Sequence, residues 1–223
     1  MSAPTVAPTL RSPTPTEPSS EARFGRLATE EQIRTTVAAL EQNGIHTTVV
    51  RDRAEAVRAV LELIPSGAEV FDSSSQTLVA LGLDKALADT SRFHNIRPEL
   101  VRLYQEKKAD AQRKLGASPD VIVGSVHALT EKGQAVIASA SGSQLAPYAS
   151  GAGKVIWVAG TQKIVPDLDA AFQRVQEYTF PRENERAQKI YGVPSFVAKL
   201  LVINREFTPG RIHLVLIREN LGF

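Results

Sequence analysis

The sequence contains no cysteine among its 223 residues. Without thiols the chain cannot form disulfides, hold an iron–sulfur cluster or a thiolate zinc site, or use a cysteine nucleophile. It also lacks any apolar run near the roughly 20 residues that cross a bilayer, and it begins without the charged start and apolar stretch of a secretory signal. We therefore expect a cytoplasmic protein with no membrane segment.

A strong charge of either sign is also absent. Lys and Arg number 26 against 24 Asp and Glu, which gives a formal net charge of +2, and the basic residues are spread along the chain. Proteins held to nucleic acid by phosphate neutralisation need a much denser basic surface, so we expect no nucleic-acid partner. The four histidines never occur at metal-ligand spacing, and the sequence therefore predicts no metal and no bound cofactor.

The first 20 residues differ in composition from the remainder. Residues 1–20 are rich in Pro, Ser and Thr and have few large apolar side chains, which is typical of a disordered tail. A transit peptide is the alternative, but a single arginine and no amphipathic period argue against it. Residues 21–223 are expected to form one main domain, because the chain is 43% hydrophobic and of suitable length.

Helical and strand patterns alternate along this domain. An amphipathic helix is predicted from Thr29 to Asn43, and a strand over "IHTTVV" (45–50) follows it. Apolar runs at "AEVF", "DVIVG", "KVIWVA" and "IHLVLI" predict further buried strands, and one long charged helix is predicted over 98–116. Such alternation with short connections favours a Rossmann-like α/β fold with a mostly parallel sheet and flanking helices.

A β-hairpin is predicted in addition to this sheet. The segment "HALTEKGQAVIAS" contains two β-prone runs on either side of Glu131, Lys132 and Gly133, which is a hairpin signal.

A hydroxyl residue followed by Gln recurs in three turns, "DSSSQ", "SASGSQ" and "GTQ". Each turn lies close to a predicted strand, and in a parallel sheet the carboxyl ends of the strands meet at one edge, where ligands bind. We therefore expect a site for a phosphate or carboxylate, because small residues, hydroxyls and free N–H groups gather there. The predicted ligand-binding residues are Ser74, Ser75, Gln76, Ser141, Ser143, Gln144, Thr161 and Gln162.

A simpler interpretation is that these serines only cap helices, each contributing about 1 kcal/mol to its helix. In that case "SGSQLAPYAS" is a short helix entered at Ser141 to Ser143 and nothing more.

Two titratable residues are candidates for catalysis. Glu131, at the predicted hairpin tip, could act as a general base or nucleophile, and Lys163 could supply positive charge from the turn "GTQK". Among the histidines, His127 alone lies on the predicted ligand edge.

The segments "GSVHALTEKGQAVIASASGSQL", "VIWVAGTQKIVPDLDAAFQRVQEY", "ENERAQKIYG" and "GRIHLVLIRENLGF" resemble the LUD-domain family, which is named for lactate utilisation and includes lactate utilisation protein C. The resemblance covers about residues 25–223. It implies a Rossmann-like fold similar to glucosamine-6-phosphate deaminase, ribose-5-phosphate isomerase and the coenzyme A transferases. Glu131 and Gly133 match a turn common in the family, whereas Thr130 and Lys132 depart from it.

The resemblance implies three functional hypotheses. The first is a protein that binds a small anionic metabolite in or beside lactate or organic-acid oxidation, as a subunit without its own redox centre. The second is a self-sufficient sugar-phosphate isomerase or coenzyme A transferase-like enzyme that uses Glu131. The third is a structural partner of an iron–sulfur protein, since the family's lactate members work beside iron–sulfur subunits.

Overall fold

The structure is a computed structural model that describes residues 19–88 and 91–223. The predicted tail 1–20 lies outside the described residues except for its last two. Of these, Ser19 caps the first helix by accepting a hydrogen bond from the Ala22 amide, and Ser20 begins that helix. No helix within the described ranges has the length and apolar character needed to cross a membrane.

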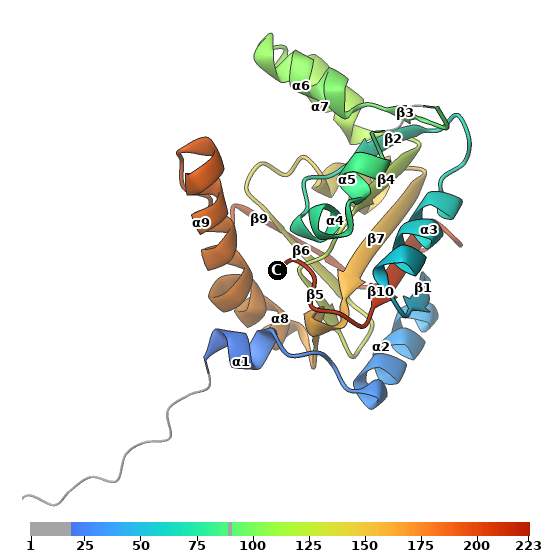
Figure 1. Cartoon of the computed structure of the whole chain (residues 1–223), viewed down its shortest axis with the longest axis vertical. Helices are drawn as coiled ribbons and strands as arrows, with labels where there is room; N and C mark the ends of the chain where they lie inside the picture. The colour runs from blue at the N-terminus through green and yellow to red at the C-terminus, as the bar shows by residue number, and fades with distance from the viewer. Residues whose placement is uncertain (1–18, 89–90) are drawn as a thin grey trace, which may run out of the picture.

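Six parallel strands form the central sheet, in the order β1-β10-β7-β4-β2-β3 (Figure 1). The predicted α/β fold is therefore confirmed. The strands are β1 (Ile45–Val50), β2 (Glu69–Asp72), β3 (His94–Asn95), β4 (Val121–Gly124), β7 (Lys154–Gly160) and β10 (Ile212–Ile217).

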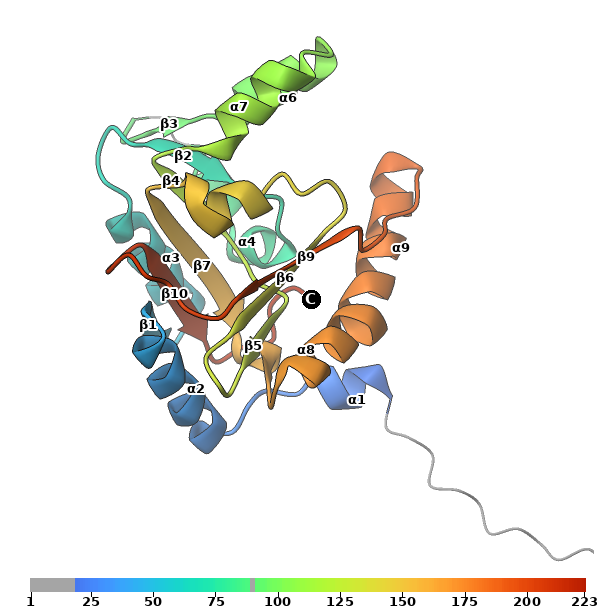
Figure 2. The same cartoon turned by 180° about the vertical axis from the view of Figure 1, so that it is seen from behind.

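Helices cover both faces of this sheet (Figures 1 and 2). Successive side chains of a strand point to opposite faces, so the buried apolar runs supply two cores. Trp157 of β7 shares one core with Leu40 of α2, and its neighbour Val158 shares the other with Val60 of α3. The helices are α1 (Ser20–Phe24), α2 (Glu30–Gln42), α3 (Arg53–Leu63), α4 (Gln76–Leu81), α5 (Leu83–Ala86), α6 (Arg97–Gln105), α7 (Ala109–Ala117), α8 (Leu168–Arg174) and α9 (Phe180–Tyr191).

A second sheet contains the predicted hairpin. Its strands are β5 (Ala128–Thr130), β6 (Ala135–Ser139), β8 (Ile164–Val165) and β9 (Lys199–Ile203), in the order β8-β5-β6-β9. Strands β5 and β6 are antiparallel, which confirms the hairpin. Gly133 makes the turn with a φ of +78°, and a Cβ there would meet the Ala39 backbone at 2.5 Å, so the turn requires glycine.

The prediction of one long helix over 98–116 is wrong. The chain breaks at Lys107, which adopts a left-handed φ of 56°, and the two halves become α6 and α7. The Gln112 side chain donates to the Leu100 carbonyl oxygen at 3.2 Å and ties the halves together. This α6–α7 pair extends away from the sheet (Figures 1 and 2).

Candidate functional site

A cavity of about 290 Å³ lies at the carboxyl ends of β2 and β4, the edge where the sequence predicts a ligand. Ser73 follows β2 directly and Ser125 follows β4, and both line the cavity. The base of the hairpin, the loop after β6 and the start of α9 close the remaining sides. The lining is rich in hydroxyl groups, from Ser73, Ser74, Ser75, Thr77, Ser125, Ser139, Ser141, Ser143, Tyr148, Thr179 and Ser195.

Two of the three hydroxyl-Gln turns meet at this cavity. The residues they contribute to its lining are Ser74, Ser75, Gln76, Ser141, Ser143 and Gln144. The third turn does not: the Gln162 amide nitrogen instead donates to the Leu221 carbonyl oxygen at 3.0 Å, and Thr161 is buried. That turn reaches the cavity through its next residue, Lys163.

Some of these hydroxyls also support local structure. Ser75 caps α4, because its Oγ accepts from the Leu78 amide at 3.4 Å. Ser139 Oγ donates to Gln144 Oε1 at 3.0 Å and fixes the loop after β6. Helical structure there begins only at Leu145 and continues in a π-helical turn, Pro147–Gly151, so Ser141 and Ser143 precede it. The interpretation as helix caps thus applies to Ser75, while the loop serines lie on the cavity wall.

Lys163 is a buried lysine at the floor of the cavity, with 1% of its surface exposed. Its Nζ lies 3.0 Å from each of three oxygen atoms, Thr77 Oγ1, Ser125 Oγ and the Val126 carbonyl. Burial, and secondarily the charge of Arg174, lower the pKa of Lys163 well below its ordinary value.

The oxygen atoms around Lys163 are placed to accept hydrogen bonds. The Ser125 hydroxyl donates to the Val158 carbonyl at 2.7 Å, and the Thr77 hydroxyl donates to the Leu221 carbonyl at 3.1 Å. Both hydroxyl oxygens, like the Val126 carbonyl, are then left to accept from Lys163. Three acceptors match the three N–H bonds of an ammonium ion. Burial disfavours that charged form, and within the described residues no carboxylate pairs with it.

A second buried cation, Arg174, lies behind the cavity wall. It ends α8, and its Nη1 donates to the His127 carbonyl and, at 3.2 Å, to Thr179 Oγ1, both on cavity-lining residues. Its Nε and Nη2 have no hydrogen-bond partner within the described ranges. Burial lowers the pKa of Arg174 to about 10, so it stays charged at neutral pH. In the part of the chain that the structure describes, neither Lys163 nor Arg174 forms an ion pair with a carboxylate.

His127 lines the cavity as a neutral ring. Its Nδ1 accepts a hydrogen bond from the Ala138 amide at 3.0 Å, so its proton is on Nε2. Burial, then the charges of Lys163 and Arg174, lower the pKa of His127 to about 3. The histidine thus offers a hydrogen-bond donor without adding charge.

Glu131 lies at the far end of the hairpin and does not line this cavity. Its carboxylate accepts from Gln32 Nε2 at 2.9 Å, next to α2. The opposite end of the hairpin, with His127 and Ser139, lines the cavity. Strands β5 and β6 separate the turn at Glu131 from that end. The carboxylate that does line the cavity is Glu183 of α9, which Arg186 binds through two contacts of 2.7 Å.

Sequence reasoning missed Glu183, Arg186 and Thr179 as parts of this site. They lie on one continuous helical segment that runs from α8 through a π-helical turn, Val175–Thr179, into α9. The π-helical turn shifts the helical period, and this displaces the residues that follow it from the apolar stripe of α8. The polar segment "ENERAQKIYG" contains Glu183 and Arg186, but its sequence indicates only the family resemblance.

Replacing Glu183 and Glu131 one at a time by glutamine shows which of the two carboxylates lies at the binding site. Glu183→Gln should strengthen the binding of a small carboxylate about fivefold, because Arg186 loses its partner and a negative charge leaves the cavity; a partly exposed pair of this kind contributes roughly 1 kcal/mol. Glu131→Gln, the matched control, should leave the affinity unchanged. Isothermal titration calorimetry measures both, and the reverse pattern would assign the site to the hairpin tip.

A family model and a solved structure are similar to this chain. The family model described as LUD domain matches residues 33–217. A solved structure of a DUF162 family protein from Deinococcus radiodurans is 13% identical, with a TM-score of 0.47, and the match covers 86% of this chain and 99% of that chain. No curated protein matches the sequence. Within the described residues there is no group of three or more side chains able to hold a metal ion.

Proposed function

Because the chain belongs to the LUD domain family, which is linked to lactate utilisation, we propose that it binds a small organic anion in the 290 Å³ cavity. The expected ligand is a short hydroxy or oxo acid, and the protein acts in or beside organic-acid oxidation. With no cysteine to hold a redox cluster, it would do so as a subunit whose electrons are carried by an iron–sulfur partner.

The observation that carries this proposal is a pair of buried basic side chains that form no ion pair with a carboxylate in the part of the chain that the structure describes. Lys163 and Arg174 are almost fully buried, and burying a charge without an opposite charge costs several kcal/mol. A carboxylate bound over Ser125 and Thr77 would supply the missing negative charge. It would also raise the lowered pKa of Lys163, because an opposite charge favours the ammonium form.

The uncharged lining fits the rest of such a ligand. Hydroxyl groups both donate and accept hydrogen bonds, so they can pair with a carboxylate, a hydroxyl or a carbonyl group. His127 adds a donor at Nε2, and Gln76 and Gln144 add amide groups. A self-sufficient enzyme that uses Glu131 has less support, because Glu131 contacts Gln32 and does not line the cavity.

A thermal-shift screen tests the proposal. L-lactate, pyruvate and related short acids should raise the melting temperature, since a ligand of the folded state stabilises it, whereas the corresponding amides should not. Ser143→Leu, which puts bulk on the cavity wall, should abolish the shift. Ser66→Leu is the matched control, because Ser66 is equally exposed and lines neither cavity. A full shift in Ser143→Leu, or stabilisation by amides as strong as by acids, would refute the proposal.

A further inference from the structure

A second cavity, of about 630 Å³, adjoins the first. The two share part of their walls: Ser73, Ser74, Ser141, Ser143 and Gln144 line both. The far side of the second cavity is the α6–α7 pair, the arm created by the break at Lys107. The serine-rich turns therefore lie between two cavities and not at the end of one.

The second cavity has a different chemistry from the first. Its lining includes Phe71, Leu100, Val101, Tyr104 and Ala117. Val101 is 46% exposed and Tyr104 is 73% exposed, although side chains of this size are usually buried. Its two cations already have partners, since Arg97 pairs with Asp72 and Arg113 with Asp110. The second cavity thus has an apolar side formed by α6 and α7, and its lining cations are paired, whereas the basic group of the first cavity, Lys163, has no carboxylate partner within the described residues.

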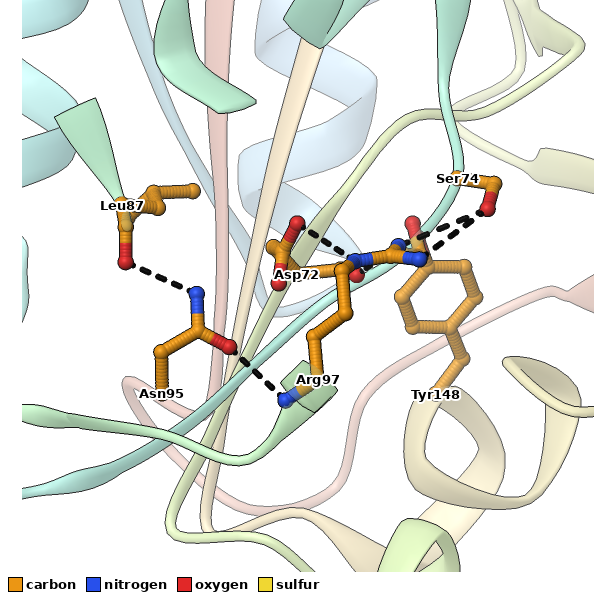
Figure 3. A network of polar contacts seen from close by, with 7 residues as sticks. Asp72, Ser74, Leu87, Asn95, Arg97 and Tyr148 are labelled. Carbon is orange, nitrogen blue, oxygen red and sulfur yellow. Dashed lines mark hydrogen bonds and ion pairs between the residues drawn. The ribbon is translucent and has the colours of Figure 1, made fainter. Parts of the chain in front are cut away.

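The wall between the cavities is fixed by a polar network around Arg97 (Figure 3). Arg97 Nε donates to Asp72 Oδ2 at 2.8 Å, and Nη1 and Nη2 each lie 3.4 Å from Ser74 Oγ. The Arg97 amide donates to Asn95 Oδ1 at 2.8 Å, which holds the start of α6. On the other side of the wall, Ser73 Oγ lies 3.2 Å from the Tyr148 hydroxyl. This network therefore joins the serine turn after β2, which both cavities share, to the start of α6.

We propose that the two cavities bind one extended ligand, an organic acid whose carboxylate head occupies the first cavity and whose alkyl or aryl tail occupies the second. The inference rests on the proposed function for its head group, and it adds the tail. The serine wall is shared, so one ligand can extend from the first cavity into the second. Lys163 lies only in the first cavity, so the carboxylate binds there. An apolar tail in the second cavity would bury the exposed side chains of Val101 and Tyr104.

Calorimetric titration with L-lactate and with 2-hydroxyoctanoate tests this inference, because the two acids share a head and differ in the tail. Each methylene buried in the second cavity should tighten binding about fourfold, so the longer acid should bind at least tenfold more tightly. Val101→Trp, which places an indole ring on the wall of the second cavity, should lower the ratio of the two affinities.

Val79→Trp is the matched control, because Val79 is 52% exposed on α4, lines neither cavity and should keep the wild-type ratio. If Val101→Trp does not fold, Tyr104→Ala should still lower the ratio. An unchanged ratio of the two affinities in both variants would overturn the inference, and so would equal binding of the two acids by the wild type. The proposed function would still stand in either case if lactate binds. If neither acid binds, it is the proposed function that fails.

Discussion

Lowering the pH from 6.5 to about 3 is expected to destabilise the fold by up to about 5 kcal/mol through His127 alone. The pKa of this histidine is about 3 in the folded protein, against 6.5 in the unfolded chain, so between these values the unfolded state binds the extra proton. The stabilising contribution is complete above pH 6.5 and is lost as the pH falls toward 3. His127 is only partly buried, so solvent screens its charge and about 5 kcal/mol is the upper bound.

The variant His127→Asn isolates this effect from the titration of surface carboxylates. Asn can place its side-chain oxygen where Nδ1 accepts from the Ala138 amide, so it keeps that hydrogen bond but does not titrate. Urea unfolding at several pH values should therefore show a steeper loss of stability for the wild type below pH 6.5 than for the variant, by as much as 1.4 kcal/mol per pH unit. Parallel curves would mean that His127 is accessible enough to protonate in the folded state.

Lys163→Met should weaken the binding of a small carboxylate by about 100-fold or more. The two side chains have similar length, but the variant removes the ammonium that faces Thr77 and Ser125. Leaving one member of a buried ion pair without its partner costs about 3 to 5 kcal/mol, which corresponds to a loss of more than two orders of magnitude in affinity. Calorimetry with L-lactate measures the change.

Lys154→Met is the matched control for this substitution. Lys154 begins β7, whereas Lys163 lies in the turn that follows the other end of this strand, and Lys154 Nζ donates to the Leu63 carbonyl at 3.1 Å. It lines neither cavity, so its removal should leave the affinity for the acid unchanged. Equal losses in the two variants would indicate a general effect of net charge and not a specific counter-ion at Lys163.

The location of the site could be predicted because parallel strands end at a common edge. Polar residues that follow buried strands must gather there, and Ser74 and Gln76, which follow β2, do so. Lys163 could be predicted for the same reason, as a charged residue just past β7. That it is fully buried could not be predicted, because burial depends on how the C-terminal segment and the hairpin pack over it.

Glu131 shows where sequence patterns are insufficient. The alternation of apolar residues predicted the hairpin and its turn correctly, but it contains no information about the direction in which the hairpin leaves the sheet edge. The contacts of the turn with Gln32 and Asn43 of the α2 region determine that direction, and they join residues far apart in the sequence. Glu183 was missed for a related reason, since its orientation depends on a π-helical turn.

The charge on Lys163 is tested most directly by comparing a carboxylic acid with its uncharged amide. L-lactate and lactamide have nearly the same size and differ in charge, so their ratio of affinities measures the contribution of the charge alone. In calorimetric titrations at neutral pH, the wild-type protein should bind lactate at least about 100-fold more tightly than lactamide, and Lys163→Met should reduce the ratio to near one. Equal affinities of the wild type for the two compounds, or a ratio that Lys163→Met leaves unchanged, would contradict a buried ammonium that binds an organic anion.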